Sequence, residues 1–314
     1  MSKDKYKVHN WREYNEGLKQ RGAIRVWISE EVLQQWRYQG EKKKGGQQLY
    51  SDLAIEVCLM VRKVYHLGYR QTEGFVESFF RQMKVALPVP DYSVMCRRSA
   101  ALCIALQPKS GKAISDIVVD STGLKVYGEG EWKVRKHGWG KHRTWMKLHV
   151  ALDAEDQIVE AAELSTNAVD DAAVAEQLVA QIPAVINSFT GDGAYDKAKV
   201  RRYLRQRACE QGEAMLQCIP PRQGAVVDTK GKAYLQQRNE DIGTMRRLGR
   251  AQWKLLTNYH QRSKAETFMF RYKVILGGAL QAREIRRQKT EVRVGCKILN
   301  HMLQIAKPSS EKVA

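Results

Sequence analysis

The chain has 314 residues, and its 53 Lys and Arg against 34 Asp and Glu give a formal net charge of +19. This length allows one large core or two smaller ones, and so large a positive excess indicates an anionic partner, first of all nucleic acid. No apolar run is long enough to span a membrane and the first residues lack the apolar core of a signal peptide, so we expect a cytoplasmic, nucleoid-associated protein.

Residues 1–110 form a basic region that we predict to be helical and to bind DNA. Its polar stretch EKKKGGQQ, residues 41–48, indicates a flexible connection. Apolar residues at helical spacing then predict one helix capped by Ser51 and a second at 71–83.

A third helix in this region carries two neighbouring arginines. Ser93 is its predicted cap, and Arg97 and Arg98 follow on the same helix. A last helix with exposed arginines is typical of a helix-turn-helix reader, in which such residues meet bases or phosphates. A plain helical bundle with a basic surface is the alternative.

Residues 111–305 alternate between strand and helix patterns, which predicts a mixed α/β sheet flanked by helices. Strands are predicted at 116–121, 145–153, 157–165, 187–191 and 214–220. Helices are predicted at 171–181, 197–211, 259–273 and 282–305. The pattern is lost at 221–258, which we interpret as a short polar insertion, and residues 306–314 are predicted to be a tail.

The segment YHQRSKAETFMFRYK, residues 259–273, joins an apolar side to a charged side. On a helix, steps of three, four and seven place on one face Tyr259, Arg262, Glu266 and Lys273. The opposite apolar face predicts burial, so the charged face is presented to a ligand. A carboxylate between cations there can hold a divalent metal beside a phosphate. The alternative is an exposed helix with ordinary ion pairs such as Arg262 with Glu266.

Two aspartates follow predicted strands, where ligands collect in sheets of this kind. Asp120 ends the first strand, and Asp192 follows the fourth strand between two glycines that permit a sharp turn. Asp196 also follows the fourth strand, and we interpret it as the N-cap of the 197–211 helix.

With Glu266 on a helix packed against the sheet, three carboxylates would converge, and their repulsion demands a counter-charge. Oxygen ligands favour Mg²⁺ or Mn²⁺ over zinc. Two such ions can activate an attacking water or 3′ hydroxyl and stabilise the leaving oxygen of phosphoryl transfer.

The order Asp120, Asp192, Glu266 and the spacing Tyr-x2-Arg-x3-Glu-x6-Lys from Tyr259 resemble a known family. They are similar to the DDE transposases of bacterial insertion sequences with a Tyr-Arg-Glu-Lys signature, and residues 120–137 (DSTGLKVYGEGEWKVRKH) resemble the insertion-sequence-five branch. The resemblance implies an RNase H-like core, two Mg²⁺ or Mn²⁺ ions on the three acids, cleavage at the ends of a mobile element and joining of the 3′ ends to target DNA. The short insertion departs from relatives with a large β-rich insertion domain.

Further basic residues are candidates for contacts with double-stranded DNA, both of the element ends and of the target. A tryptophan-rich segment after the first catalytic strand supplies Lys133, Arg135, Lys136 and Arg143. The alternative is a basic hairpin whose tryptophans are core residues. Arg262 and Lys273 are expected on a phosphate near the scissile bond, and Tyr259 is a further candidate DNA contact. Because two ends must be paired, we expect a homodimer or larger assembly in the synaptic complex.

Other functions remain open from the sequence. A tyrosine recombinase would use a phenol such as Tyr259 as nucleophile, but His260 and Arg262 have the wrong spacing for its partners. A non-catalytic DNA-binding regulatory protein, including an inactivated transposase, would bind element ends without cutting them. A structure-selective nuclease of the same fold would cut DNA without joining strands.

Overall fold

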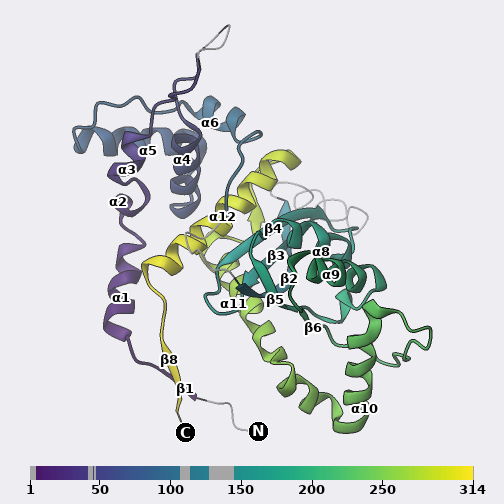
Figure 1. Cartoon of the computed structure of the whole chain (residues 1–314). Helices are drawn as coiled ribbons and strands as arrows, with labels where there is room; N and C mark the ends of the chain where they lie inside the picture. Colours follow the sequence, from purple (N-terminus) through teal and green to yellow (C-terminus); the bar gives the residue numbers. More distant parts are fainter. Residues whose placement is uncertain (1–4, 42–44, 46, 107–113, 127–144, 314) are drawn as a thin grey trace, which may run out of the picture. The chain divides into compact units, whose positions relative to one another are not determined.

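A computed structural model describes residues 5–41, 45, 47–106, 114–126 and 145–313. The chain divides into two compact units (Figure 1), the first made of Met1–Ala105 with Val294–Ala314 and the second of Leu106–Arg293. None of the helices in the described ranges combines the length and the apolar character that crossing a bilayer demands. The predicted tail, residues 306–314, belongs to the first unit.

The first unit contains six helices in its described N-terminal part. Their bounds, α1 to α6, are Trp11–Gln20, Ile24–Trp27, Glu30–Gln34, Asp52–Val64, Tyr69–Gln82 and Tyr92–Arg98. The two ends of the chain also pair as antiparallel strands, β1 (Lys5–Val8) with β8 (Ser310–Val313). The unit is therefore mainly helical rather than all-α, because the ends of the chain form a small sheet.

The caps of α4 and α6 test the predicted starts of these helices. Ser51 caps α4 as predicted, since its Oγ accepts a hydrogen bond from the Ala54 N–H at 3.0 Å. Helix α6 is capped by Asp91 rather than Ser93, because Asp91 Oδ1 accepts the Ser93 N–H at 2.7 Å. Asp and Ser are equally good N-caps, so the sequence alone did not discriminate between them.

Buried polar contacts hold the first unit together. Trp36 is fully buried; its Nε1–H donates to the Pro88 carbonyl at 2.8 Å, and its ring centroid lies 5.0 Å from that of Phe80. Arg21 donates to the carbonyls of Met302 at 3.1 Å and Ala306 at 2.6 Å. Met302 lies in the last turn of helix α12 (Ile285–Ile305) and Ala306 directly follows the helix, where a positive charge is favourable.

The second unit is a mixed α/β fold, as predicted. Strands β2 to β7 are Ile114–Val126, Trp145–Asp153, Val159–Thr166, Val185–Thr190, Leu216–Cys218 and Ala279–Leu280. The sheet has the order β4-β3-β2-β5-β6, and β7 pairs with the end of β2. Strand β3 is antiparallel to β2 and β4, whereas β5 is parallel to β2 and β6 is parallel to β5.

Helices cover both faces of this sheet. The helices α8 to α12 are Asp171–Ala180, Ala198–Gln211, Gln236–Leu256, Ser263–Arg271 and Ile285–Ile305, and α12 belongs to the first unit from Val294 onwards. Ile117 and Val119 of β2 share one apolar core with α8 and α9. Since side chains alternate along a strand, Asp120 points to the opposite face. Helix α11 packs against β2.

The segment 221–258, predicted to be an irregular insertion, contains the 21-residue helix α10. Gly249 kinks this helix with φ 81° and ψ 160°, a conformation that is essentially restricted to glycine. Across the kink, Trp253 Nε1 donates to Asp241 Oδ1 at 2.8 Å, although the residues are 12 positions apart. A straight helix would separate them by about 18 Å along its axis. The kink interrupts the helical period, which explains why the sequence pattern was lost.

We predict that Gly249→Ala lowers the free energy of unfolding by about 1–3 kcal/mol, because alanine does not tolerate this backbone conformation. Gly243→Ala is the matched control on the same helix, and it should raise stability by about 0.5–1 kcal/mol through helix propensity. In the described structure a Cβ at either position would meet no heavy atom within 4 Å. Urea unfolding measures both variants, and effects of equal sign would contradict the role of the kink.

Candidate active site

The parallel pairing of β2 with β5 places Asp120 and Asp192 at the same level. The last residues paired between β2 and β5 are Val118 and Thr190. Asp120 and Asp192 each lie two positions later in the sequence. If this register is continued, the two side chains lie on neighbouring strands and on the same face. The prediction that Asp120 ends its strand was wrong. Pairing with β3 extends β2 to Val126, six residues beyond Asp120.

A helical stretch brings a third carboxylate to this face. The predicted helix 259–273 is continuous, but it opens with a 3-10 turn at Tyr259–Arg262 and closes with a π turn at Tyr272–Leu276. Arg262 Nη1 donates to Asp120 Oδ2 at 3.2 Å, and its Nη2 donates to Glu266. One guanidinium therefore joins the carboxylate of the strand to the carboxylate of the helix.

The pKa shifts show that the acids, Arg262 and Tyr259 share one environment. Burial raises the pKa of Asp120; the Ser121 N–H and Arg262 oppose this rise, and Asp192 and Glu266 add to it. Burial also raises the pKa of Tyr259, which Arg262 lowers and which Asp192 and Asp120 raise. The charges of Asp192 and Glu266 therefore act on Asp120, and Arg262 joins Asp120 and Glu266 directly.

The loop after β5 holds Asp192 in a fixed conformation. Asp192 Oδ1 accepts the Ala194 N–H at 2.9 Å and caps the 3-10 turn Gly193–Tyr195. A Cβ at Gly191 would lie 2.8 Å from Cδ2 of Tyr195. Because the φ of Gly191 is not positive, this glycine is required by the packing of Tyr195 rather than by a sharp turn.

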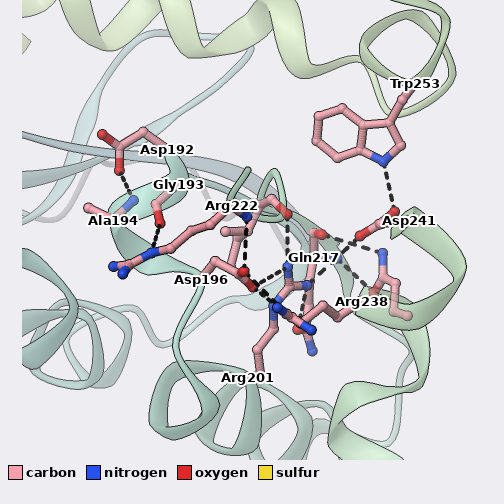
Figure 2. A network of polar contacts seen from close by, with 12 residues as sticks. Asp192, Gly193, Ala194, Asp196, Arg201, Gln217, Arg222, Arg238, Asp241 and Trp253 are labelled. Carbon is pink, nitrogen blue, oxygen red and sulfur yellow. Dashed lines mark hydrogen bonds and ion pairs between the residues drawn. The ribbon is translucent and has the colours of Figure 1, made fainter. Parts of the chain in front are cut away.

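Asp196 is not the N-cap of α9, and that prediction was wrong. The cap position is Lys197, which makes no side-chain capping bond. Figure 2 shows two arginines converging on Asp196, whose side chain is 1% exposed. Arg201 Nη2 donates to it at 3.2 Å, and Arg238 Nε donates to both its oxygens at 2.9 and 3.1 Å. These ion pairs occupy Asp196 and remove it as a rival metal ligand.

Arg201 is the centre of a buried network that the sequence analysis missed. Its side chain is fully buried, and its Nη2 donates to the Ile219 carbonyl at 2.8 Å. Its Nη1 lies 3.9 Å from Oδ2 of Asp241. Its only signal in the sequence is its position three residues before the buried Leu204, on the inner face of α9. Its partners come from segments far along the chain, so no local pattern could identify them.

The first turns of helix α10 bind the edge of the sheet next to the Arg201 network. Gln237 Oε1 accepts the Gln217 N–H at 3.0 Å, which satisfies a backbone donor on the last strand of the sheet. Arg238 and Asp241 join the network from the same helix, and Trp253 extends it across the kink (Figure 2).

The donor types of the site fit a hard divalent cation. Asp120, Asp192 and Glu266 offer only carboxylate oxygens, which Mg²⁺ and Mn²⁺ prefer. Within the described residues, no group of three His, Cys, Asp or Glu side chains is gathered closely enough to hold a metal ion. The guanidinium of Arg262 bridges Asp120 and Glu266, so a cation shared by these acids would have to displace it.

The predicted DNA contacts have different locations. Four of them fall outside the described residues, namely Lys133, Arg135, Lys136 and Arg143. Lys273 is exposed on the π turn. In the first unit, Arg97 is exposed and donates to Ser93 Oγ at 3.1 Å. Arg98 pairs with Asp52, which joins α6 to the start of α4.

Comparison with known proteins identifies one family by its sequence profiles and two similar solved structures. The sequence profile of a family described as Transposase DDE domain matches residues 111–300, and a second profile with the same description matches residues 19–129. The chain is similar to the piggyBac transposase in a synaptic complex with hairpin DNA, with TM-score 0.42 and 10% identity over 96% of this chain and 77% of that one. It is also similar to the Drosophila P element transposase in a strand transfer complex, with TM-score 0.31 and 9% identity over 93% and 86%.

We predict that Asp241→Asn changes how stability depends on pH. Burial raises the pKa of Asp241 to about 6, against opposing effects of Trp253 and Arg201. The folded pKa exceeds the unfolded value near 4, so the stabilisation is full below about pH 4 and is lost as the pH rises towards 6. The unfolding free energy of the variant minus that of wild type should therefore increase by about 1–3 kcal/mol as the pH rises from about 4 to 6.

An exposed acid outside this network provides the control for this measurement. Glu210→Gln removes one carboxylate from α9 and leaves the groups that act on Asp241 unchanged. Its unfolding free energy should follow the wild-type pH profile. Urea unfolding at several pH values distinguishes the two, and parallel profiles for Asp241→Asn and wild type would contradict the shifted pKa.

Proposed function

Because this chain belongs to the Transposase DDE domain family, whose profile covers more than half of it, we propose that it acts on the ends of a mobile element. It binds the terminal inverted repeats, cleaves DNA there by metal-dependent hydrolysis and joins the freed 3′ ends to target DNA. The observation that carries the proposal is the pairing of Arg262 with both Asp120 and Glu266, in an environment that includes Asp192.

In this proposal Asp120, Asp192 and Glu266 are the catalytic carboxylates and would hold two Mg²⁺ or Mn²⁺ ions. Such ions, when bound, lower the pKa of the attacking hydroxyl and neutralise charge on the leaving oxygen. The chain itself contributes the positions of the acids, because Asp120 lies on β2, Asp192 follows the paired strand β5, and Glu266 lies on a helix packed against β2. Arg262 is suited to hold a phosphate, since its planar guanidinium can donate two parallel hydrogen bonds.

The remaining parts of the proposal concern fold and partners. The strand order, with β3 and β4 antiparallel on one side of β2 and β5 and β6 parallel on the other, supports an RNase H-like core. The spacing of Tyr259, Arg262, Glu266 and Lys273 supports the Tyr-Arg-Glu-Lys signature and the insertion-sequence-five branch. The helices α4 to α6 are candidates for the reader of the inverted repeat, and two paired ends imply at least a homodimer on DNA.

We predict that Asp120→Asn, Asp192→Asn and Glu266→Gln each reduce cleavage at least about 100-fold, since even residues that only orient metal ligands contribute 10–100-fold. The substrate is a duplex with the inverted repeat that borders the coding region, incubated with Mg²⁺. Glu210→Gln, an exposed acid on α9, is the control and should cleave normally. If all three variants cleave like wild type, the assignment is wrong. Binding without cleavage by wild type under any metal would favour the non-catalytic regulatory protein.

We also predict that Arg262→Gln raises the affinity for Mn²⁺ by about 10-fold, because it removes a cation that competes for Asp120 and Glu266. Titration calorimetry on the full chain without DNA measures this binding independently of activity. Arg205→Gln on α9 removes an equal charge from an exposed position and should leave the affinity nearly unchanged. Weaker Mn²⁺ binding by Arg262→Gln would instead make this arginine a support for the metal site.

A further inference from the structure

The outer side of α10 carries positive charge that the catalytic proposal does not use. Between residues 242 and 256 the helix has four basic side chains and no acidic one. They are Arg246, Arg247, Arg250 and Lys254, and the three arginines are exposed. Arginines without acidic neighbours suit a polyanion, because each can donate several hydrogen bonds to phosphate oxygens.

This basic run reaches the candidate active site at its C-terminal end. Arg250 lowers the pKa of Tyr259, which Asp192 and Asp120 raise. Lys254 Nζ lies 5.7 Å from the centroid of the Tyr259 ring. The positive charge therefore begins beside Tyr259, where the helical stretch that carries Glu266 starts, and continues along α10 towards Arg246.

Buried contacts fix α10 to the loop that bears Asp192. Asp196 ends that loop and accepts hydrogen bonds from Arg238 of α10. The same carboxylate accepts the N–H of Arg222 at 3.3 Å, and Arg222 Nε donates to the Gly193 carbonyl at 3.4 Å (Figure 2). One buried acid thus serves both the helix and the loop, so the basic run has a defined position relative to Asp192.

We propose that α10 is a DNA-binding arm, whose exposed arginines bind phosphate groups of the duplex that extends away from the scissile bond. This inference rests on the proposed function for the identity of the anion. It names a surface and a partner that the three acids do not require. A protein partner with an acidic surface is the competing occupant, and the experiments below separate the two.

The first experiment measures DNA binding by the full chain in EDTA, with a duplex of arbitrary sequence about three helical turns long. For Arg246→Gln combined with Arg247→Gln, the slope of log K against log salt concentration should fall by about 2, since each lost phosphate contact removes nearly one released counterion. The control combines Lys199→Gln with Arg205→Gln, which removes the same charge from exposed positions of another helix, α9. Equal slopes for the two double variants would overturn the proposal.

The second experiment asks where the duplex lies. Leu248, between the arginines, is 47% exposed, and Leu216 on β6 is a matched apolar residue at 44%. A photoreactive p-benzoylphenylalanine in place of Leu248 should cross-link to the duplex, whereas the same group in place of Leu216 should not. Equal cross-linking at both positions, or no cross-linking at position 248, would overturn the proposal that α10 binds the duplex.

These readouts are independent of the chemistry at the carboxylates. Both use DNA binding without metal, so an error in the catalytic assignment leaves them unchanged. Conversely, if the α10 variants bind DNA like the control, the loss of cleavage expected for Asp120→Asn still tests the proposed function.

Discussion

The pairing of one guanidinium, that of Arg262, with two carboxylates is the interaction that joins strand β2 to helix α11 in the second unit. The parallel register of β2 and β5 brings Asp120 to the level of Asp192, and Glu266 approaches from the helix above this face. Neighbouring carboxylates disfavour one another's ionised form, and a positive charge offsets this effect. Arg262 supplies positive charge to Asp120 and Glu266, and in the proposed function divalent ions would take its place between these two acids.

The buried charge of Arg201 explains how α10 is held against the rest of the second unit. Burying Arg201 alone would be costly, and removing one partner of such a pair is strongly destabilising. Asp196 and Asp241 offset its charge and the Ile219 carbonyl accepts one of its hydrogen bonds, and these partners come from three separate segments. The same contacts that neutralise the arginine thus join the helix, the last strand and the loop of Asp192 into one assembly.

The sequence predicts what depends on local pattern. Strand β3 has the predicted bounds because its side chains alternate, and the helix with Glu266 shows a clear apolar face. The structure differs where distant partners decide. Asp196 looks like a cap, yet it pairs with Arg238, 42 positions away. Helix α10 was missed because the kink at Gly249 breaks the period on which helix prediction relies.

Pairing of β1 with β8 has a consequence during translation. The first unit needs residues from both ends of the chain, whereas the second is one continuous stretch. At about 5–20 residues per second, the ribosome takes roughly 10–40 s to synthesise the intervening stretch. The second unit can fold on the ribosome while the N-terminal segment still lacks its partner strand. A nascent chain terminated before that strand would carry the three acids but never complete the unit at its ends.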